Sequence, residues 1–253
     1  MDAQEVWLQV KALREIKHRL VRHYANHVGN IVLAGPFRGL ILPERGYWNA
    51  GDHIAKIFGT YENCLHSILY EAMSKPYSAY LDIGCADGYY ATGFAHACRS
   101  AVCVGFDTDQ RAQYVAGQIA EKNQLSNCHI RGNFDAHSVS RIRSEYGLKD
   151  DARIFLKCDI EGEELNLFEP ELCSTLACVD LLIEIHDFKM NDNVGMRLEQ
   201  RLSETHEITF VAEGGRNPNM YSFLSSLPED IRWLILSEGR GRSMRWLHGV
   251  ARG

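Results

Sequence analysis

The chain has 253 residues, of which 45% are hydrophobic and 10% aromatic, so it can bury one substantial core. A formal net charge of −6 argues against general affinity for the phosphates of nucleic acids and favours a small or neutral substrate. No stretch approaches about 18 uncharged apolar residues, and the start of the chain lacks the apolar segment of a signal peptide. We therefore expect a cytoplasmic protein without nucleic-acid or membrane partners.

The N-terminal third predicts helices around an irregular segment. Residues 3–27 carry apolar side chains at helical spacing between basic ones, which predicts a surface helix through which two copies could pair as a homodimer. Residues 31–59 are rich in glycine, proline and aromatic residues without a clear period, and we expect them to be irregular. A helix over 61–73 follows.

From residue 79 onward, short apolar strands alternate with helices. We expect strands at 79–83, 101–106, 128–130, 153–159, 179–186, 207–212 and 244–250, with helices over 89–99, 109–122, 137–146, 163–168 and 196–203. This alternation predicts an α/β fold, in which helices cover both faces of a mostly parallel sheet. Residues 219–242 show no clear pattern.

The first of these strands leads into a glycine turn, GCADG at 84–88. Glycines let the backbone turn tightly and approach a ligand, and the free amides of the helix that follows then face that ligand. Asp107, about 20 residues further on at the end of the second strand, occupies the position that holds ribose hydroxyls in such folds. The pattern predicts a ligand that contains adenosine.

The details of the turn favour S-adenosylmethionine among such ligands. Ala86 stands where a dinucleotide fingerprint needs its second glycine, which disfavours a pyrophosphate, and no Walker-type lysine follows the turn. S-adenosylmethionine carries positive charge on its amino group and sulfonium, so a carboxylate such as Asp82 is tolerable beside it. An NAD-dependent oxidoreductase using the same cradle and a non-catalytic binding module are the alternatives.

Polar side chains close the fourth and fifth strands. Asp159 and Glu161 are two residues apart, as are Glu184 and His186, so each pair lies on one side of its strand. If the strands are neighbours, they form a carboxylate-rich pocket with one imidazole, where Lys157 could pair with a carboxylate.

Three interpretations of this cluster stay open. His186 could be the general base for a hydroxyl acceptor, because its ordinary pKa is near neutrality. Asp159, Glu184 and His186 could instead bind a divalent metal that acidifies the hydroxyl. The cluster could also be a structural hydrogen-bond network.

Four sequence strings make the chain resemble class I S-adenosylmethionine-dependent methyltransferases, and the FkbM-like group in particular. They are GPFRGL at 35–40, FGTYENCL at 58–65, FLKCDIEGEELNLFEP at 155–170 and LLIEIHDF at 181–188. The third resembles the K-x-D-x-E-G-x-E segment of that group and places Lys157, Asp159, Glu161 and Glu164 on its positions. Asp87 and Asp107 depart from the residues that the group often carries there.

The resemblance implies a Rossmann-like methyltransferase fold with a seven-stranded sheet and methyl transfer, most simply to a hydroxyl of a small molecule. The composition and spacing of the sequence predict an N-terminal helical extension and cofactor-site lid over residues 1–75 and a catalytic domain over 76–253. The residues expected to contact the cofactor are Tyr61, Asp82, Gly84, Cys85, Ala86, Gly88, Asp107, Thr108, Asn133, Phe134 and Asp159. Those expected in catalysis are His186, Asp159 and Glu184.

Two further expectations concern loops. Asn133 or Asp135 could hydrogen-bond the adenine amine while Phe134 packs on the ring, or these residues could simply cap the loop. An arginine between residues 213 and 245 could hold a carboxylate or phosphate of the substrate. The eight cysteines include no C-x-x-C pair, so we expect them to be reduced and structural.

Overall fold

The computed structural model describes residues 2–44, 47, 50–187 and 193–252. Two compact units make up the chain: residues 1–63 with 214–242, and residues 64–213 with 243–253. The sequence predicts a boundary after residue 75, whereas the first unit ends at residue 63 and also takes in 214–242. The assignment of the lid role stays a prediction.

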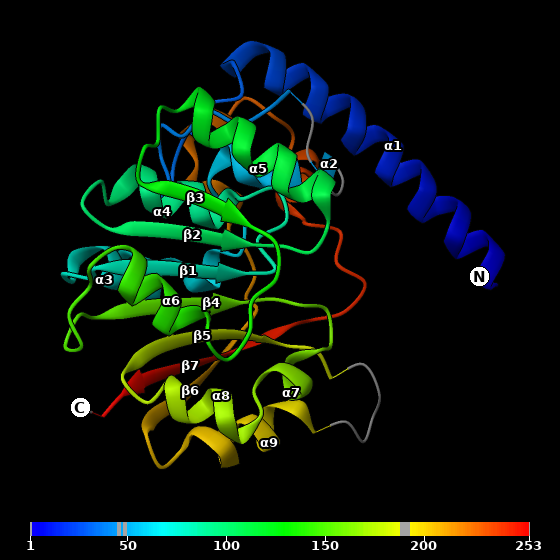
Figure 1. Ribbon diagram of the computed structural model, residues 1–253. Coiled ribbons are helices and arrows are strands. Elements are labelled where there is room, and N and C mark those ends of the chain that lie inside the picture. The colour runs from blue at the N-terminus through cyan, green and yellow to red at the C-terminus, as the bar shows by residue number, and fades with distance from the viewer. Residues whose placement is uncertain (1, 45–46, 48–49, 188–192, 253) are drawn as a thin grey trace. The chain divides into compact units, whose positions relative to one another are not determined.

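The second unit is built on a seven-stranded sheet with the order β3-β2-β1-β4-β5-β7-β6 (Figure 1). Strands β1 to β5 are parallel, and β7 is antiparallel to both β5 and β6. The strands are β1 (Ala79–Ile83), β2 (Val102–Phe106), β3 (Cys128–Arg131), β4 (Ile154–Cys158), β5 (Val179–Ile185), β6 (His206–Ala212) and β7 (Arg245–Ala251). The predicted α/β fold with a mostly parallel seven-stranded sheet is confirmed.

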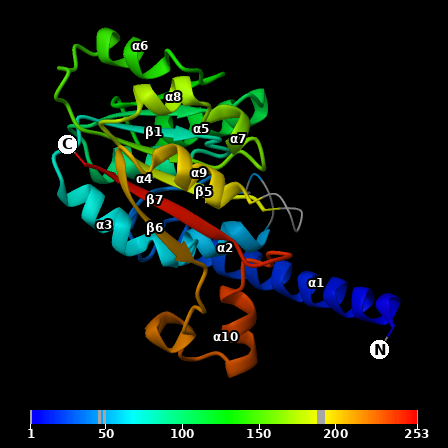
Figure 2. The ribbon, with the colours of Figure 1, turned by 90° about the horizontal axis from the view of Figure 1, so that it is seen from below.

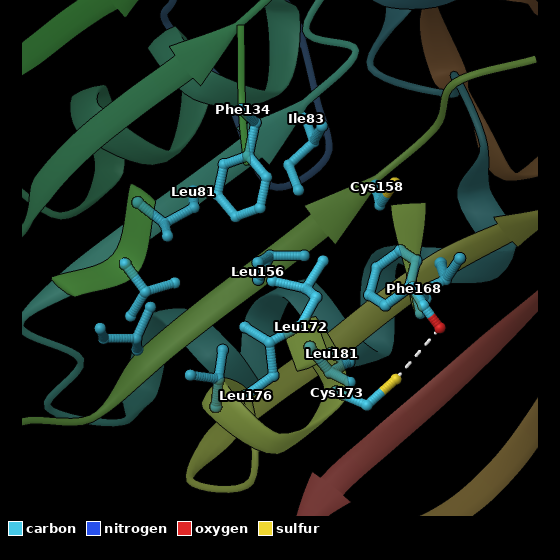
Figure 3. Close-up of a cluster of buried hydrophobic side chains, with 14 of the residues drawn as sticks. Leu81, Ile83, Phe134, Leu156, Cys158, Phe168, Leu172, Cys173, Leu176 and Leu181 are labelled. Carbon is cyan, nitrogen blue, oxygen red and sulfur yellow. Dashed lines mark hydrogen bonds between the residues drawn. The ribbon is translucent and has the colours of Figure 1, made fainter. Parts of the chain in front are cut away.

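Helices cover both faces of this sheet (Figure 2). They are α3 (His66–Ser74), α4 (Tyr89–Ala97), α5 (Gln110–Lys122), α6 (Ser138–Glu145), α7 (Glu164–Leu167), α8 (Pro170–Thr175) and α9 (Val194–Leu202). Helix α4 contacts β1 and β2, and α5 contacts β3. Buried side chains of α6, α8 and α9 join the main apolar core on the other face (Figure 3).

The alternation of side chains along each strand separates the core from the site. Leu81, Leu156 and Leu181 belong to the apolar core. Asp82 and Lys157, one residue further along β1 and β4, are register partners and therefore share the opposite face. Asp159, two residues after Lys157, lies on the same face, as do Glu184 and His186, which follow the Lys157 partner Leu182 at spacings of two.

The first unit is helical. It contains α1 (Ala3–Val28), α2 (Ala50–Phe58) and α10 (Glu229–Leu236), with short 3-10 turns η2 (Pro218–Met220) and η3 (Ser222–Leu224). The predicted N-terminal helix is confirmed, and Leu8, Leu13 and Ile16 are exposed on it. Pairing of two copies through this helix stays a prediction. Among the described helices, none combines the length and apolar character needed to cross a membrane.

Two predicted elements are wrong in extent. Residues 50–58, expected to be irregular, form α2, whose Ile54, Ile57 and Phe58 are fully buried. The helix predicted over 61–73 begins only at His66, after the 3-10 turn η1 (Asn63–Leu65). Glu62 has a φ of 45°, which a right-handed helix cannot include, so α2 and α3 are separate.

The first prediction concerns the turn after β1. Gly84 has a φ of +72°, and a Cβ there would lie 1.8 Å from the backbone oxygen of Asp159. Gly84→Ala should therefore lower the free energy of unfolding by about 2–4 kcal/mol, measured by denaturant unfolding. The matched control is Gly117→Ala in α5, where a Cβ meets nothing within 4 Å and the unfolding free energy should stay level or rise by about 1 kcal/mol. Equal stability of Gly84→Ala and wild type would contradict the close approach.

Candidate functional site

The turn after β1 is shaped by the chain itself. Gly84 and Cys85 both donate backbone hydrogen bonds of 2.9 Å to the carbonyl of Phe106 in β2. A Cβ on Gly88 would lie 2.6 Å from the Cβ of Ala116 in α5. Both predicted glycines are thus required by the packing of the turn against β4 and α5, independently of any ligand.

Asp107 ties the turn to the end of β2. Its Oδ2 accepts a hydrogen bond of 2.8 Å from the amide of Ala86, and its Oδ1 accepts one of 2.9 Å from the amide of Asp109. Asp107 is half-buried and Thr108 is exposed. Because a carboxylate oxygen has two lone pairs, Asp107 keeps acceptor capacity for a ligand hydroxyl.

A buried ion pair lies beneath the turn. Asp82 and Lys157 are 0% and 3% exposed, and the Lys157 Nζ lies 3.4 Å from Asp82 and 3.6 Å from Asp159. The Asp82 Oδ2 accepts a hydrogen bond from the amide of Ala91 in α4. Burial raises the pKa of Asp82, and the charge of Lys157 opposes that rise. The predicted pairing of Lys157 with the carboxylates is confirmed.

The loop after β3 holds residues of different kinds. Asn133 is exposed, while Phe134 is buried and packs edge-on against Phe106 with ring centroids 5.1 Å apart. Asp135 pairs with Arg141 at 2.9 Å and accepts a hydrogen bond from the amide of His137. Asp135 is therefore engaged in capping the loop, and adenine contacts by Asn133 and Phe134 stay predictions.

Because β4 and β5 are neighbours in the sheet, as expected, the carboxylates that follow them lie around the imidazole of His186. His186 Nδ1 lies 2.6 Å from Oε1 of Glu164, which is fully buried. The Nε2 atom lies 3.7 Å from Asp159 and from Glu161, and 3.9 Å from Glu184. Because a carboxylate only accepts, Nδ1 carries the proton and Nε2 faces the other three carboxylates.

The contact between Glu164 and His186 was not predicted from the sequence. Glu161 and Gly162 both have positive φ, at 57° and 108°, and this bend returns the chain so that α7 begins beneath the end of β5. The Glu164 Oε1 also accepts a hydrogen bond of 3.1 Å from the amide of Gly162. Only the resemblance to the K-x-D-x-E-G-x-E segment singled out Glu164.

The site has more negative than positive groups. Among the residues that the structure describes, the carboxylates gathered near one lysine, Lys157, and one imidazole are those of Asp82, Asp159, Glu161, Glu164 and Glu184. Within the described residues, Asp159 Oδ1 and Glu164 Oε2 are buried without a hydrogen-bond partner. Ligand atoms of Asp159, Glu184 and His186 all lie within 4.8 Å of one another. The arrangement fits a cationic ligand, either an organic cation or a divalent metal.

Tyr61 and the arginines of residues 213–245 lie in other surroundings. Tyr61 belongs to the first unit, where the Lys56 ammonium lies 4.9 Å from its ring centroid. Arg216 and Arg240 of the same unit form ion pairs with Glu238. In the second unit, Arg245 pairs with Asp187 at 2.7 Å. A cofactor contact by Tyr61 stays a prediction, and these three arginines already have carboxylate partners.

No family model and no curated protein matches the sequence. Solved structures that are similar include the MccD protein, at 13% identity over 76% of this chain and 98% of that one, with a TM-score of 0.45. An O-methyltransferase from Bacillus cereus in complex with SAH is 13% identical over 72% and 77%, with a TM-score of 0.43. The precorrin-6y C5,15-methyltransferase from Geobacter metallireducens is 8% identical over 73% and 89%, with a TM-score of 0.45. Similarity of this size assigns no activity, so any function has to be argued from the site residues.

The second prediction concerns the protonation of His186. Burial lowers the pKa of its imidazole, but the hydrogen bond and charge of Glu164, with Asp159 and Glu161, outweigh burial and raise the pKa above 6.5. Protonated His186 therefore stabilises the fold fully below about pH 6.5, and this contribution is lost as the pH rises through the folded-state pKa. An NMR pH titration of the imidazole in metal-free buffer measures the shift.

Glu164→Gln should lower the pKa of His186, because burial lowers this pKa and the substitution removes the negative charge that raises it most. Glu161→Gln is the matched control, since that side chain is 70% exposed and should change the pKa less. An unchanged pKa of His186 in Glu164→Gln would show that this contact does not control the imidazole.

Proposed function

We propose that the chain is a class I S-adenosylmethionine-dependent methyltransferase, similar to the FkbM-like group, that acts on a hydroxyl oxygen of a small molecule. The observation that carries the proposal is the group of carboxylates around one buried imidazole, next to a turn suited to adenosine. S-adenosylmethionine supplies a methyl group on a positively charged sulfonium. The small-molecule acceptor is supported by the negative net charge and by the family resemblance, and the proposed cytoplasmic location by the lack of a long apolar stretch.

The cofactor would be held on the turn and by the acids that flank it. Asp107 has spare acceptor capacity for the ribose hydroxyls. The start of α4 offers fewer backbone amides than the sequence predicts, because those of Tyr89 and Ala91 donate to Asp87 and Asp82. Asp159 is 21% exposed and could accept a hydrogen bond from the amino group of the cofactor. Asp82 is fully buried and bonded to α4 and Lys157, so its part is to hold the turn in place.

His186 would act on the acceptor side. Glu164 accepts the proton at Nδ1, so that in the neutral imidazole Nε2 carries no proton and is directed to the side where Asp159 and Glu184 lie. An acceptor hydroxyl at Nε2 could then transfer its proton to the imidazole.

A divalent metal is the other role supported by the same residues. The distances of 3.7 and 3.9 Å from Nε2 to Asp159 and Glu184 are too long for hydrogen bonds. They suit ligands that share one ion, given metal–ligand distances of about 2.0–2.2 Å. A carboxylate on the second ring nitrogen, as Glu164 provides, is the usual support for a metal-binding histidine. Such a metal would lower the pKa of a hydroxyl bound to it.

The third prediction tests the cofactor. By calorimetry, the protein should bind S-adenosylmethionine and S-adenosylhomocysteine but not NAD, because the alanine in the turn leaves less room for a pyrophosphate. Asp107→Ala should weaken binding of S-adenosylhomocysteine by about 1–3 kcal/mol. Glu121→Ala, an exposed acid on α5, is the control and should bind as wild type does. Preference for NAD would favour the oxidoreductase, and unchanged affinity in Asp107→Ala would remove Asp107 from the ribose site.

The fourth prediction tests the acceptor side. His186→Ala should reduce methyl transfer by about 10²–10⁴-fold while the affinity for S-adenosylhomocysteine stays nearly constant. The control is His137→Ala, an exposed histidine, which should keep wild-type turnover.

Chelation then separates the two roles of His186. If a metal is bound, a chelator should reproduce the loss, and added divalent ion should restore the activity of the wild type. If His186 is the base, a chelator should have no effect and the rate should fall with acidity near the imidazole pKa. Full activity of His186→Ala would leave only a structural role.

A further inference from the structure

A pocket of about 350 Å³ lies beside His186, on the side of α7 and α9. Its polar lining consists of His186, Asn166, Glu169, Arg197 and Arg201. The volume suits a small organic molecule or part of one. Because His186 lines this pocket and also contacts the carboxylates at the strand ends, a molecule in the pocket would touch the same imidazole that the cluster surrounds.

The arginine deeper along α9 has a structural role. Arg201 Nη1 donates hydrogen bonds of 2.7 and 2.8 Å to the carbonyls of Leu165 and Phe168. These carbonyls lie at the C-terminal end of α7, where a short helix leaves its acceptors without partners of its own. Arg201 is therefore explained by the fold.

Arg197, one turn earlier on the same face of α9, has no such explanation. Its side chain is exposed, and in the part of the chain that the structure describes its guanidinium makes no hydrogen bond or ion pair. Like charges four residues apart on a helix repel each other, so the pair is unfavourable without an anion nearby. The pocket carboxylate, Glu169, is exposed and forms no ion pair with Arg197.

The groups that contact His186 and those that line the pocket beside it differ in charge. Asp159, Glu161 and Glu184 face its Nε2 and would repel an anion. Arg197 and Arg201 line the pocket and would attract one, with Glu169 as the carboxylate of that lining. A molecule with an anionic end would accordingly place that end in the pocket.

We propose that this pocket binds an anionic group of the acceptor, a carboxylate or a phosphate monoester, through Arg197. The acceptor is then a hydroxy acid or a phosphorylated alcohol, oriented with its hydroxyl toward His186 and its anion toward α9. A guanidinium suits both anions because it can donate two parallel hydrogen bonds. The orientation of the hydroxyl rests on the proposed methyl transfer, whereas the anion site does not.

Two matched pairs of probes test the proposal by NMR, with the imidazole signal of His186 assigned from the His186→Ala spectrum. The carboxylate pair is 4-hydroxybenzoate and 4-hydroxybenzyl alcohol, and the phosphate pair is glycerol 3-phosphate and glycerol. At least one anion should shift the His186 signal in a saturable way, while its neutral partner should not. The pair that responds identifies the anion class.

Variants at Arg197 supply the second measurement. Arg197→Ala should raise the dissociation constant of the bound anion about tenfold or more, Arg197→Glu should abolish binding, and Arg197→Lys should retain part of it. Lys122→Ala is the control, because it removes one exposed positive charge in α5 and should leave binding unchanged. Backbone spectra of each variant show whether the fold is retained.

The proposal would be overturned if no anion shifts the His186 signal, if neutral and charged partners bind alike, or if Arg197→Ala binds as wild type does. Because the NMR assay measures binding and needs no methyl transfer, it tests the anion site separately from the proposed methyltransferase function. Anion binding that depends on Arg197, in a protein that does not bind S-adenosylmethionine, would support the pocket and contradict the methyltransferase.

Discussion

The site depends on Lys157, a buried ammonium between two carboxylates. Its Nζ lies 3.4 Å from Asp82 at the end of β1 and 3.6 Å from Asp159 beyond the end of β4. Buried charges are costly unless paired, so without this cation the two acids could not both approach the turn. The Tyr90 and Trp246 rings, with centroids 4.8 and 5.6 Å from the ammonium, surround it further. The ion pair of Asp82 and Lys157 joins β1 to β4, and Asp82 also holds the start of α4 through the amide of Ala91.

On either side of the Asp82–Lys157 ion pair, the strand ends at one edge of the sheet carry different groups. On the β1 and β2 side, Asp107 fixes the turn through the amide of Ala86 and keeps acceptor capacity. On the β4 and β5 side, the carboxylates outnumber the cations among the described residues, and Glu164 holds one nitrogen of His186 so that the other faces the excess charge. The proposed methyl donor, a cation, would lie between Asp107 and the imidazole, because an acid can accept from its ribose hydroxyls and the carboxylates can balance its positive charge.

The sequence predicted the strands and their ends because their signals are local. Continuous apolar runs mark buried parallel strands, and a spacing of two placed Asp159 with Glu161 and Glu184 with His186. The contact between Glu164 and His186 could not be predicted in this way, since it depends on the positive φ of Glu161, which no pattern of residue types reveals. Helix α8 was missed because its six residues make fewer than two turns. Helices α2 and α10 were missed because they lie in stretches of the sequence without a clear apolar period. The glycines of the turn were identified correctly, but their packing partners, the Asp159 carbonyl and Ala116, are distant in sequence.

The central claim is that the end of β1 holds the cofactor while the ends of β4 and β5 face the reacting group. The most direct test is a crystal structure of the protein with S-adenosylhomocysteine. The account predicts that the ribose hydroxyls hydrogen-bond to Asp107 and that the sulfur atom faces the side on which Asp159 and His186 lie. A ligand bound away from the glycine turn, or one with its sulfur directed away from His186, would contradict it.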